Sequence, residues 1–515
     1  MPPRKKAKPV QASASASYSH EVEVRSTRSN VHRTRSSVVQ SESPAGCDGP
    51  ITRSLASARS RSDVVALVTS PIRNLPLEVL ADIFMLAMHT ECVDLYPKKS
   101  MNRSEIESRQ KMLLNPLALC SVCSSWRFLA FSIPKLWTRV FVDIQSGMGK
   151  AQAQRKAAGL VQWIKRSHML PLVLYIFVDV SAPLDGTGRE APIVSVINDY
   201  ASHWEALYLQ STTEDPFGSL QRSHSFRFDG WHSLRRLCSP DSRSPSYKNQ
   251  SIPWAQLTHL QIHPYMTALD ATIVLKECPK LVQLSISVGI CWTTLPIILH
   301  NLVSLSLSTH SLSHVVDSLF LPSLRDMYIT GLSILDVEPL SNFFTRSSCT
   351  LDKLELSALS LRPRDQLLNL LGHESCNSLT SLKLQELRNC PAAPVSDEVF
   401  RRLTLHEEDT LCPRLKYLTI DCSIKCSVST LQKMVESRNG FPDCQRRDEL
   451  LQCLCLRLAQ CSNKLDKFGN GCEMEYTRRL HDRGDRRPYR FYSISFRRRD
   501  LSSTQLRINH SGFFF

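Results

Sequence analysis

No run of about 18 uncharged apolar residues, the length that spans a bilayer, occurs in this sequence of 515 residues. The nearest such run, at residues 170–180, has the length of a strand, and the basic N-terminus has no apolar signal region. The sequence also lacks a phosphate-binding loop, a Gly-x-Ser-x-Gly elbow and a cluster with metal-ligand spacing. We therefore expect a soluble protein of the nucleus and/or cytoplasm that is not an enzyme, with no catalytic residue, cofactor, metal or membrane partner.

The 18 cysteines form no disulfide framework, and without a secretory signal we expect reduced thiols that act as small apolar residues. Cys120-x-x-Cys123 could hold zinc, but both cysteines fall on the apolar stripe of an expected helix and no second pair follows. His310-x-x-x-His314 lacks the glutamate of a zinc protease. A structural role is favoured for both pairs.

The net charge of +15 is concentrated at the two ends of the chain. Residues 1–62 carry +7 and residues 464–515 carry +6, which leaves +2 for the 401 residues between them. Residues 1–70 are rich in Ser, Arg and Ala and poor in aromatics, so burial cannot offset the entropy of ordering them. We expect a disordered basic tail there, with a short cluster of the nuclear-import type at residues 3–9, and a nearly neutral folded body.

Two segments within residues 72–137 have the apolar spacing of amphipathic helices. In the first, Pro76 suits the first helical turn, where its missing donor is harmless, and Glu78 and Asp82 favour the positive end of the helix dipole. One face of this helix carries Leu80, Ile83, Phe84 and Ala87.

The second segment, residues 116–130, is expected to form one helix and is followed by Ile133-Pro134-Lys135-Leu136-Trp137. On pattern alone, a helix pair with buried tryptophans is more often plain core than an interface. The apolar stripe of the second helix consists of Leu119, Val122, Cys123, Trp126 and Ala130.

The order of three short motifs shifts this balance towards an interface. The motifs are Leu75-Pro76-x-Glu78-Val79-Leu80-x-x-Ile83-Phe84, Val122-Cys123-x-x-Trp126-Arg127 and Pro134-x-Leu136-Trp137. Together they resemble the F-box, and in particular the F-box-like domains common in fungal proteins. The polar insert at residues 89–114 departs from the compact domain and is interpreted as a solvated loop.

The resemblance implies that this module binds a Skp-type adaptor and thereby joins a cullin scaffold in a ubiquitin ligase. A domain of about 60 residues is marginally stable alone, so stabilisation by a partner is physically reasonable. The residues that the resemblance assigns to adaptor contacts or their immediate support are Leu75, Pro76, Val79, Leu80, Ile83, Val122, Cys123, Trp126 and Trp137.

A Leu-x-x-Leu-x-Leu pattern recurs seven times between residues 257 and 420. Successive copies start 24, 21, 22, 27, 28 and 36 residues apart, and weaker copies start at Trp204, Leu234 and Leu451. Each copy predicts a strand with alternate leucines inward, paired in parallel with its neighbours. The seven copies start at Leu257, Leu281, Leu302, Leu324, Leu351, Leu379 and Leu415.

The array resembles the leucine-rich repeats of F-box proteins. Segments between the copies, such as residues 364–373 and 395–405, are expected to be helices that cover one side. The Asn or Cys that commonly follows the last strand leucine by three residues is absent, so helix packing should hold the array together. The positions concerned are occupied by His310, Leu332, Leu359 and Leu387.

Arginines alternate with aromatic residues near the C-terminus, for example Arg486, Tyr489 and Phe491. Such a pattern can bind RNA or single-stranded DNA. A solvated tail, or a strand pair that caps the exposed end of the array, is favoured instead.

We expect an α+β multi-domain chain with a small all-helical F-box-like module, an α/β leucine-rich-repeat solenoid and disordered basic tails. The expected function is a substrate receptor of a Skp-cullin-F-box type ubiquitin ligase that binds an unknown protein substrate. The alternatives are a leucine-rich scaffold outside any ligase and a nuclear nucleic-acid-associated protein that uses its basic tails; the neutral body disfavours nucleic acid. The expected domains are residues 1–70 (disordered basic tail), 71–145 (F-box-like, with an insert at 89–114), 150–460 (irregular solenoid) and 461–515 (basic aromatic tail).

Overall fold

The chain divides into two compact units, Met1–Asn74 and Leu75–Phe515, and Ile72 is the described residue of the first. The predictions for residues 1–70 and for the insert beyond His89 lie outside the described residues. The fold below is that of the second unit. The computed structural model describes residues 72, 75–89, 116–145, 148–179, 191–211, 226–239, 252–266, 268–288, 296–310, 312–335, 337–361, 364–386, 395–405, 409–421, 424–439, 453–458, 472–476 and 492–498.

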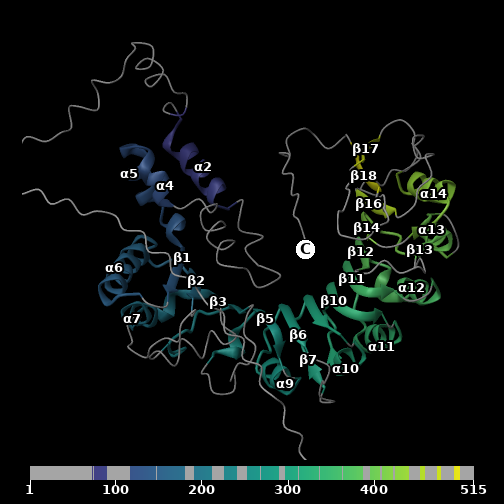
Figure 1. Ribbon diagram of the computed structural model, residues 1–515, viewed down its shortest axis with the longest axis horizontal. Coiled ribbons are helices and arrows are strands. Elements are labelled where there is room, and N and C mark those ends of the chain that lie inside the picture. Colours follow the sequence, from purple (N-terminus) through teal and green to yellow (C-terminus); the bar gives the residue numbers. More distant parts are fainter. Residues whose placement is uncertain are drawn as a thin grey trace, which may run out of the picture. The chain divides into compact units, whose positions relative to one another are not determined.

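In the described part of the second unit the strands form a sheet of 14, and they follow one another in chain order from β1 to β16 (Figure 1). Neighbours from β1 to β16 pair in parallel, whereas β18 pairs antiparallel with β16 and β17. This confirms an α/β chain with a large parallel sheet. The strands are β1 (Arg139–Gln145), β2 (Leu172–Asp179), β3 (Trp204–Ser211), β4 (Arg236–Ser239), β5 (His259–Met266), β6 (Gln283–Val288), β8 (Ser304–Thr309), β10 (Asp326–Leu335), β11 (Lys353–Leu361), β12 (Ser381–Glu386), β14 (Tyr417–Asp421), β16 (Cys453–Leu458), β17 (Cys472–Tyr476) and β18 (Tyr492–Arg498).

Two short parallel strand pairs lie outside this sheet, namely β7 (Ile297–Ile298) with β9 (Leu319–Phe320) and β13 (Val395–Ser396) with β15 (Ile424–Lys425). Helices precede the sheet and separate most of its strands. They are α2 (Leu77–His89), α4 (Pro116–Val122), α5 (Ser124–Ser132), η2 (Pro134–Trp137), α6 (Lys150–Arg166), α7 (Ala191–Asp199), η3 (Ala201–His203), η5 (Trp254–Gln256), α9 (Ala268–Lys276), α10 (Ser313–Val316), α11 (Glu338–Ser347), α12 (Arg364–Leu371), η6 (Glu374–Cys376), α13 (Asp397–Leu403) and α14 (Val428–Asn439).

The leucine motifs form the strands of the sheet, as predicted. In β8, Leu305 and Leu307 are buried while the serines between them face the other way. Leu305 lies opposite Leu284 of β6 and Met327 of β10, so the apolar positions of successive copies align across the sheet. Each copy therefore buries its leucines against its neighbours and not against itself.

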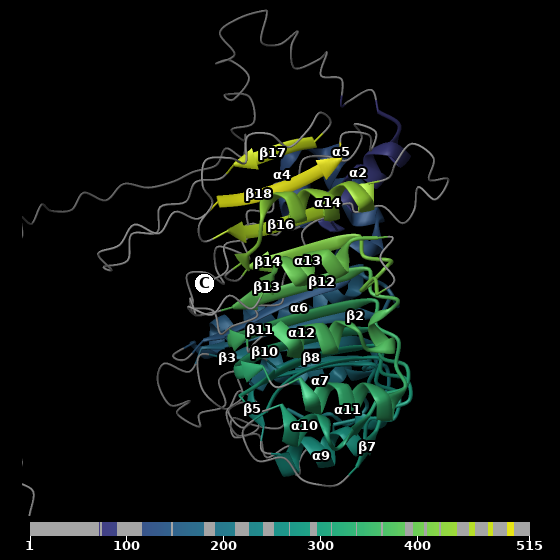
Figure 2. The ribbon, with the colours of Figure 1, turned by 90° about the vertical axis from the view of Figure 1, so that its right-hand side faces the viewer.

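The helices between strands pack on one face of the sheet (Figures 1 and 2). Their apolar side chains, such as Ile164 of α6, Phe343 of α11 and Met434 of α14, belong to the same buried cluster as the strand leucines. The opposite face of the sheet carries the alternate, mostly polar strand residues. Among the described residues no helix packs on this opposite face, which is called the helix-free face below.

A turn that begins three residues before the first leucine of a repeat copy recurs along the sheet. The sequence patterns did not predict this turn. The N–H of Leu281 donates to the carbonyl of Cys278 at 3.3 Å, and the N–H of Leu415 donates to the carbonyl of Cys412 at 3.1 Å. Cys376 holds the equivalent place before Leu379. Burial raises the pKa of the Cys278 and Cys412 thiols to about 12, so both stay neutral and pack as apolar groups. These turns add to the helix packing that was expected to hold the array.

Two expectations differ from the structure. The predicted single helix at residues 116–130 is broken at Cys123, whose extended backbone and Sγ acceptor begin a new helix by capping the N–H of Trp126 at 3.5 Å. Near the C-terminus, β17 and β18 are strands of the sheet, so residues 472–476 and 492–498 are ordered parts of the fold and not a disordered tail. They form a strand pair at the end of the sheet, which was one of the two favoured alternatives for this segment.

Candidate docking surface

Helices α2, α4, α5 and η2, called the helical cluster below, pack around a small core of their own. The rings of Phe84 in α2 and Trp126 in α5 meet edge to face, with centroids 4.9 Å apart. The buried residues of this core are Leu80, Phe84, Leu119, Cys120, Leu129, Ala130, Leu136 and Trp137.

Trp137 anchors the helical cluster to helix α6. Its indole N–H donates to the carbonyl of Ala130 at 2.8 Å, and its own carbonyl accepts the indole N–H of Trp163 at 2.9 Å. The guanidinium of Arg166 lies over the rings of both Phe131 and Trp137, 4.4 and 4.6 Å from their centroids. Trp137 is therefore a supporting residue with no accessible surface for a partner.

Helix α2 has a second apolar face, which points to solvent. Val79, Ile83 and Leu86 are 43%, 40% and 64% exposed, whereas Leu80 and Phe84, on the adjacent side of the helix, are buried. The spacing of the exposed residues, with Pro76 before them, is that of one stripe along a helix. This set, Pro76, Val79, Ile83 and Leu86, is called the α2 stripe. Contiguous exposed apolar surface is a feature that protein-interaction sites share with membrane and ligand sites.

Exposed apolar side chains also occur on α4 and α5. Phe128 is 73% exposed and Val122 is 58% exposed, and both Leu117 and Phe131 are exposed as well. A phenylalanine at such a position adds little to the stability of the isolated chain. Burial of its ring would contribute about 1.5–3 kcal/mol, most of which is not realised while the ring is exposed.

The nine residues assigned to adaptor contacts or their support differ in how deeply they are buried. Leu80 and Trp137 are buried and can only support the others. Leu86, Leu117 and Phe128 are exposed residues that the resemblance did not supply; Leu86 could have been found from the seven-residue spacing from Val79. The exposed members of the nine are Pro76, Val79, Ile83 and Val122, and the half-buried members are Leu75, Cys123 and Trp126.

The chemistry of the helical cluster is that of an apolar contact surface. Burial raises the pKa of the Cys120 thiol, and the Cys123 sulfur is engaged as a helix cap. In the described part of the chain, no group of three or more His, Cys, Asp or Glu side chains is placed to hold a metal ion. No helix among the described residues is long and apolar enough to cross a membrane.

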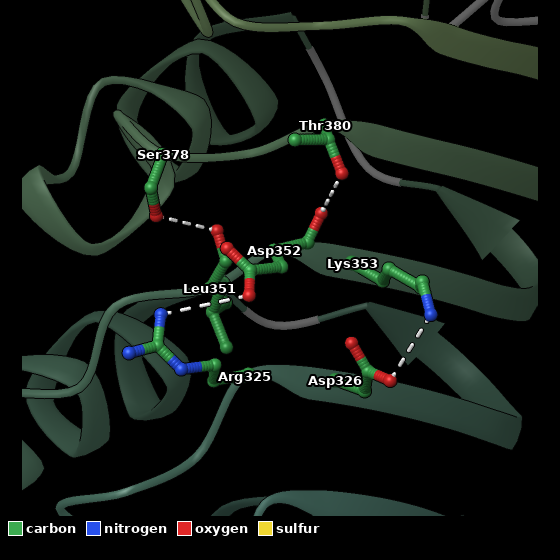
Figure 3. A network of polar contacts seen from close by, with 7 residues as sticks. All are labelled: Arg325, Asp326, Leu351, Asp352, Lys353, Ser378 and Thr380. Atoms are coloured by element: carbon green, nitrogen blue, oxygen red, sulfur yellow. Dashed lines mark hydrogen bonds and ion pairs between the residues drawn. The ribbon is translucent and has the colours of Figure 1, made fainter.

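Charges on β10, β11 and the turns before them are paired with one another (Figure 3). Lys353 Nζ lies 3.3 Å from Asp326 Oδ2, and Arg325 Nη1 lies 3.5 Å from Asp352 Oδ2. The hydroxyl of Thr380 donates to the carbonyl of Asp352 at 3.0 Å, which joins a third strand start to the network. Because each ion pair joins one positive and one negative side chain, the four charges cancel. This part of the sheet therefore favours neither an acidic nor a basic partner.

A scan against protein-family models and a search of curated proteins each found no match for this chain. The case for a function therefore rests on the residues and geometry described above.

Proposed function

We propose that the chain is a substrate receptor of a Skp-cullin-F-box type ubiquitin ligase, in which the helical cluster acts as an F-box-like module that binds the adaptor. The observation that carries the proposal is the α2 stripe. A helix that served only its own core would carry polar residues on all of its solvent-exposed surface, because exposed apolar surface gains nothing from water. Helix α2 instead exposes Val79, Ile83 and Leu86 on the side next to its buried Leu80 and Phe84.

The large sheet would act as a leucine-rich-repeat solenoid that holds a protein substrate. Such a receptor needs no nucleophile, since it acts by raising the effective concentration of a substrate lysine near the ubiquitin carrier. The polar helix-free face supports this role, because its side chains are not used by the core.

The test is calorimetric titration of the full chain with a purified Skp-type adaptor. The substitution Ile83→Asp is expected to weaken binding about 100-fold or more, because a carboxylate would be stripped of water in an apolar contact. Leu269→Asp is the matched control: Leu269 is 49% exposed on α9, outside the helical cluster, and its substitution should leave adaptor binding unchanged.

Two results would refute the proposal. If the intact chain does not bind the adaptor, the receptor function is wrong. If Ile83→Asp binds as tightly as the unaltered chain, the α2 stripe is not the contact surface. An equal urea midpoint for Ile83→Asp and Leu269→Asp excludes a general loss of folding as the cause of weaker binding.

A further inference from the structure

Strand β1 is the outermost strand at one end of the sheet in the described part of the chain, and half of its backbone groups face outward. The N–H of Val173 in β2 donates to the carbonyl of Thr138 at 2.9 Å, so the even-numbered residues from Thr138 onward bond to β2. Alternate residues of a strand turn their backbone groups to opposite edges. The N–H and C=O of Phe141 therefore point away from β2.

Helix α6 covers this outer edge of β1 at two points. The indole N–H of Trp163 donates to the carbonyl of Trp137 at 2.9 Å, and Lys156 Nζ donates to the carbonyl of Asp143 at 2.7 Å. Between these points, no hydrogen bond joins a described residue to the outward N–H or C=O of Phe141. This part of the edge, centred on the backbone of Phe141, is called the open edge. Such unpaired strand backbone is a template for another extended chain.

The side chain of Phe141 ends a stack of three rings on the helix-free face. Its ring stacks on Tyr175 of β2 with centroids 4.6 Å apart and planes 10° apart, and Tyr175 stacks on Tyr208 of β3 at 4.6 Å and 12°. Phe141 is nevertheless 40% exposed, and no ring among the described residues covers its other face. The stack therefore ends in a free aromatic face directly beside the open edge.

A strand added at the open edge would bring a side chain onto that free face. Neighbouring strands lie about 4.7–4.9 Å apart, and opposite residues place their side chains on the same face of the sheet. The residue opposite Phe141 would thus lie where a further ring of the stack belongs, because the existing rings repeat every 4.6 Å. An aromatic side chain fits best there, since stacked rings gain more than their buried area alone.

The backbone of Phe141 decides between a peptide and other planar ligands. A nucleobase can also stack on an aromatic ring, but it offers no chain of amides at the spacing of a strand. An extended peptide supplies both a donor and an acceptor for the outward N–H and C=O of Phe141. Charge takes no part in this selection, since Asp143 on the same strand already lies 3.7 Å from Lys156.

We propose that the open edge binds an extended segment of a protein partner as an added strand, with an aromatic side chain of that segment stacked on the free face of Phe141. The inference rests on the proposed function where it identifies the segment as part of the substrate. It locates the segment at the β1 end of the sheet, away from the paired charges of β10 and β11.

Peptides selected from a random phage-displayed library on the full chain test the proposal, with the synthesised consensus measured by fluorescence anisotropy. The expected consensus has one Phe, Tyr or Trp with no proline next to it. A series of consensus peptides, each N-methylated at one residue, reports strand pairing. Methylation should weaken binding about tenfold or more at every second residue and leave the residues between unaffected, because only alternate N–H groups face the partner strand.

Substitution of Phe141 tests the stack. Phe141→Ser is expected to weaken binding of the consensus peptide about tenfold, which matches the worth of an aromatic contact. Phe141→Tyr keeps the ring and should bind as the unaltered chain does. Tyr417→Ser is the matched control, because Tyr417 is an exposed aromatic residue of β14 on the same face. The N-methylated series uses the unaltered chain, so it decides the matter even if Phe141→Ser is destabilised.

Several results would overturn the inference. They are failure to select any peptide, a consensus without an aromatic residue, N-methylation effects without a period of two residues, and full peptide binding by Phe141→Ser. A dimer of the chain that Phe141→Ser dissolves in sedimentation would also overturn it, since β1 of a second copy would then occupy the open edge.

Adaptor titration of Phe141→Ser separates the two proposals. Retained adaptor binding together with loss of the peptide supports both. Adaptor binding by a chain that selects no peptide refutes the open edge alone. Absence of adaptor binding refutes the proposed function, and period-two N-methylation effects would then still support strand addition at β1.

Discussion

Some single residues have structural roles that the periodic patterns of the sequence do not predict. Arg438 of α14 is fully buried and donates to three carbonyls: Nε to Leu403 at 2.6 Å, Nη2 to Leu411 at 3.0 Å, and Nη1 and Nη2 to Cys412, each at 3.2 Å. Burial lowers its pKa to about 10, so the guanidinium is still charged at neutral pH. It ties α14 to the end of α13 and to the chain that follows it, a role that its place near the end of a polar helix did not indicate.

His259 gives the fold a predictable response to acid. Burial, and after it the Arg236 guanidinium, lower the pKa of His259 below its ordinary value. As pH falls through about 6.5, the unfolded chain therefore binds a proton that the native state resists, and stability falls. The variant His259→Gln should lose less stability than the unaltered chain between pH 7.5 and pH 5.5, as measured by urea unfolding at both values.

The sign of this prediction is unambiguous, since the folded-state pKa is the lower one. Equal losses for the two proteins, or a larger loss for His259→Gln, would contradict it. His373, whose pKa burial also lowers, remains in both proteins and sets the common background.

At the scale of helices and strands, the sequence predicted most of the sheet. Leucines at fixed spacing specify inward positions of strands, because a shift by one residue would turn every leucine to water. The break at Cys123 was not predicted, since its cap is a side-chain contact within an otherwise continuous apolar stripe. The stacking of Phe141 on Tyr175 depends on the register of β1 against β2, which no local pattern supplies.

Helix α2 shows why the candidate site could be predicted only in part. Leu80, Ile83 and Phe84 were predicted to lie on a single buried face, but Ile83 lies at the exposed edge of that face, at 40% exposure, while the other two are buried. A helix that is apolar on two sides has no sequence signal for which side meets the core. Packing against α5 and η2 decides it.

Two glycines offer a paired test of how strands and helices are built. Gly331 adopts φ +81° at an irregularity of β10, and a Cβ there would lie 3.3 Å from Ser308 Oγ and 3.4 Å from the carbonyl of Thr309. Gly331→Ala should therefore lower the free energy of unfolding by about 1–3 kcal/mol. Gly159 lies within α6 with open space around its Cβ position, so Gly159→Ala should raise it by about 0.5–1 kcal/mol.

Urea unfolding of the two variants beside the unaltered chain checks both signs. A stabilised Gly331→Ala would mean that the left-handed backbone of β10 is not required. A destabilised Gly159→Ala would mean that α6 meets a neighbour at that point.

At the scale of the whole molecule, the two ends of the sheet are completed in different ways. The charge count placed +6 in residues 464–515 and suggested a tail, but β17 and β18 use part of that segment to complete the sheet beside β16. An edge strand left unpaired would expose backbone donors and acceptors to other chains.

At the other end of the sheet, the helical cluster is joined to α6 by Trp137, Trp163 and Arg166. The proposed adaptor site is thus attached to the sheet through packed side chains.

The central claim is that the helical cluster binds an adaptor through the α2 stripe. Amide hydrogen exchange of the full chain, alone and with a saturating purified Skp-type adaptor, tests it most directly, because bound surfaces are protected from exchange. The account predicts slower exchange in residues 76–89 and 116–132 and unchanged exchange in β10 to β14. Unchanged exchange in residues 76–89, or protection confined to the strands of the sheet, would contradict it.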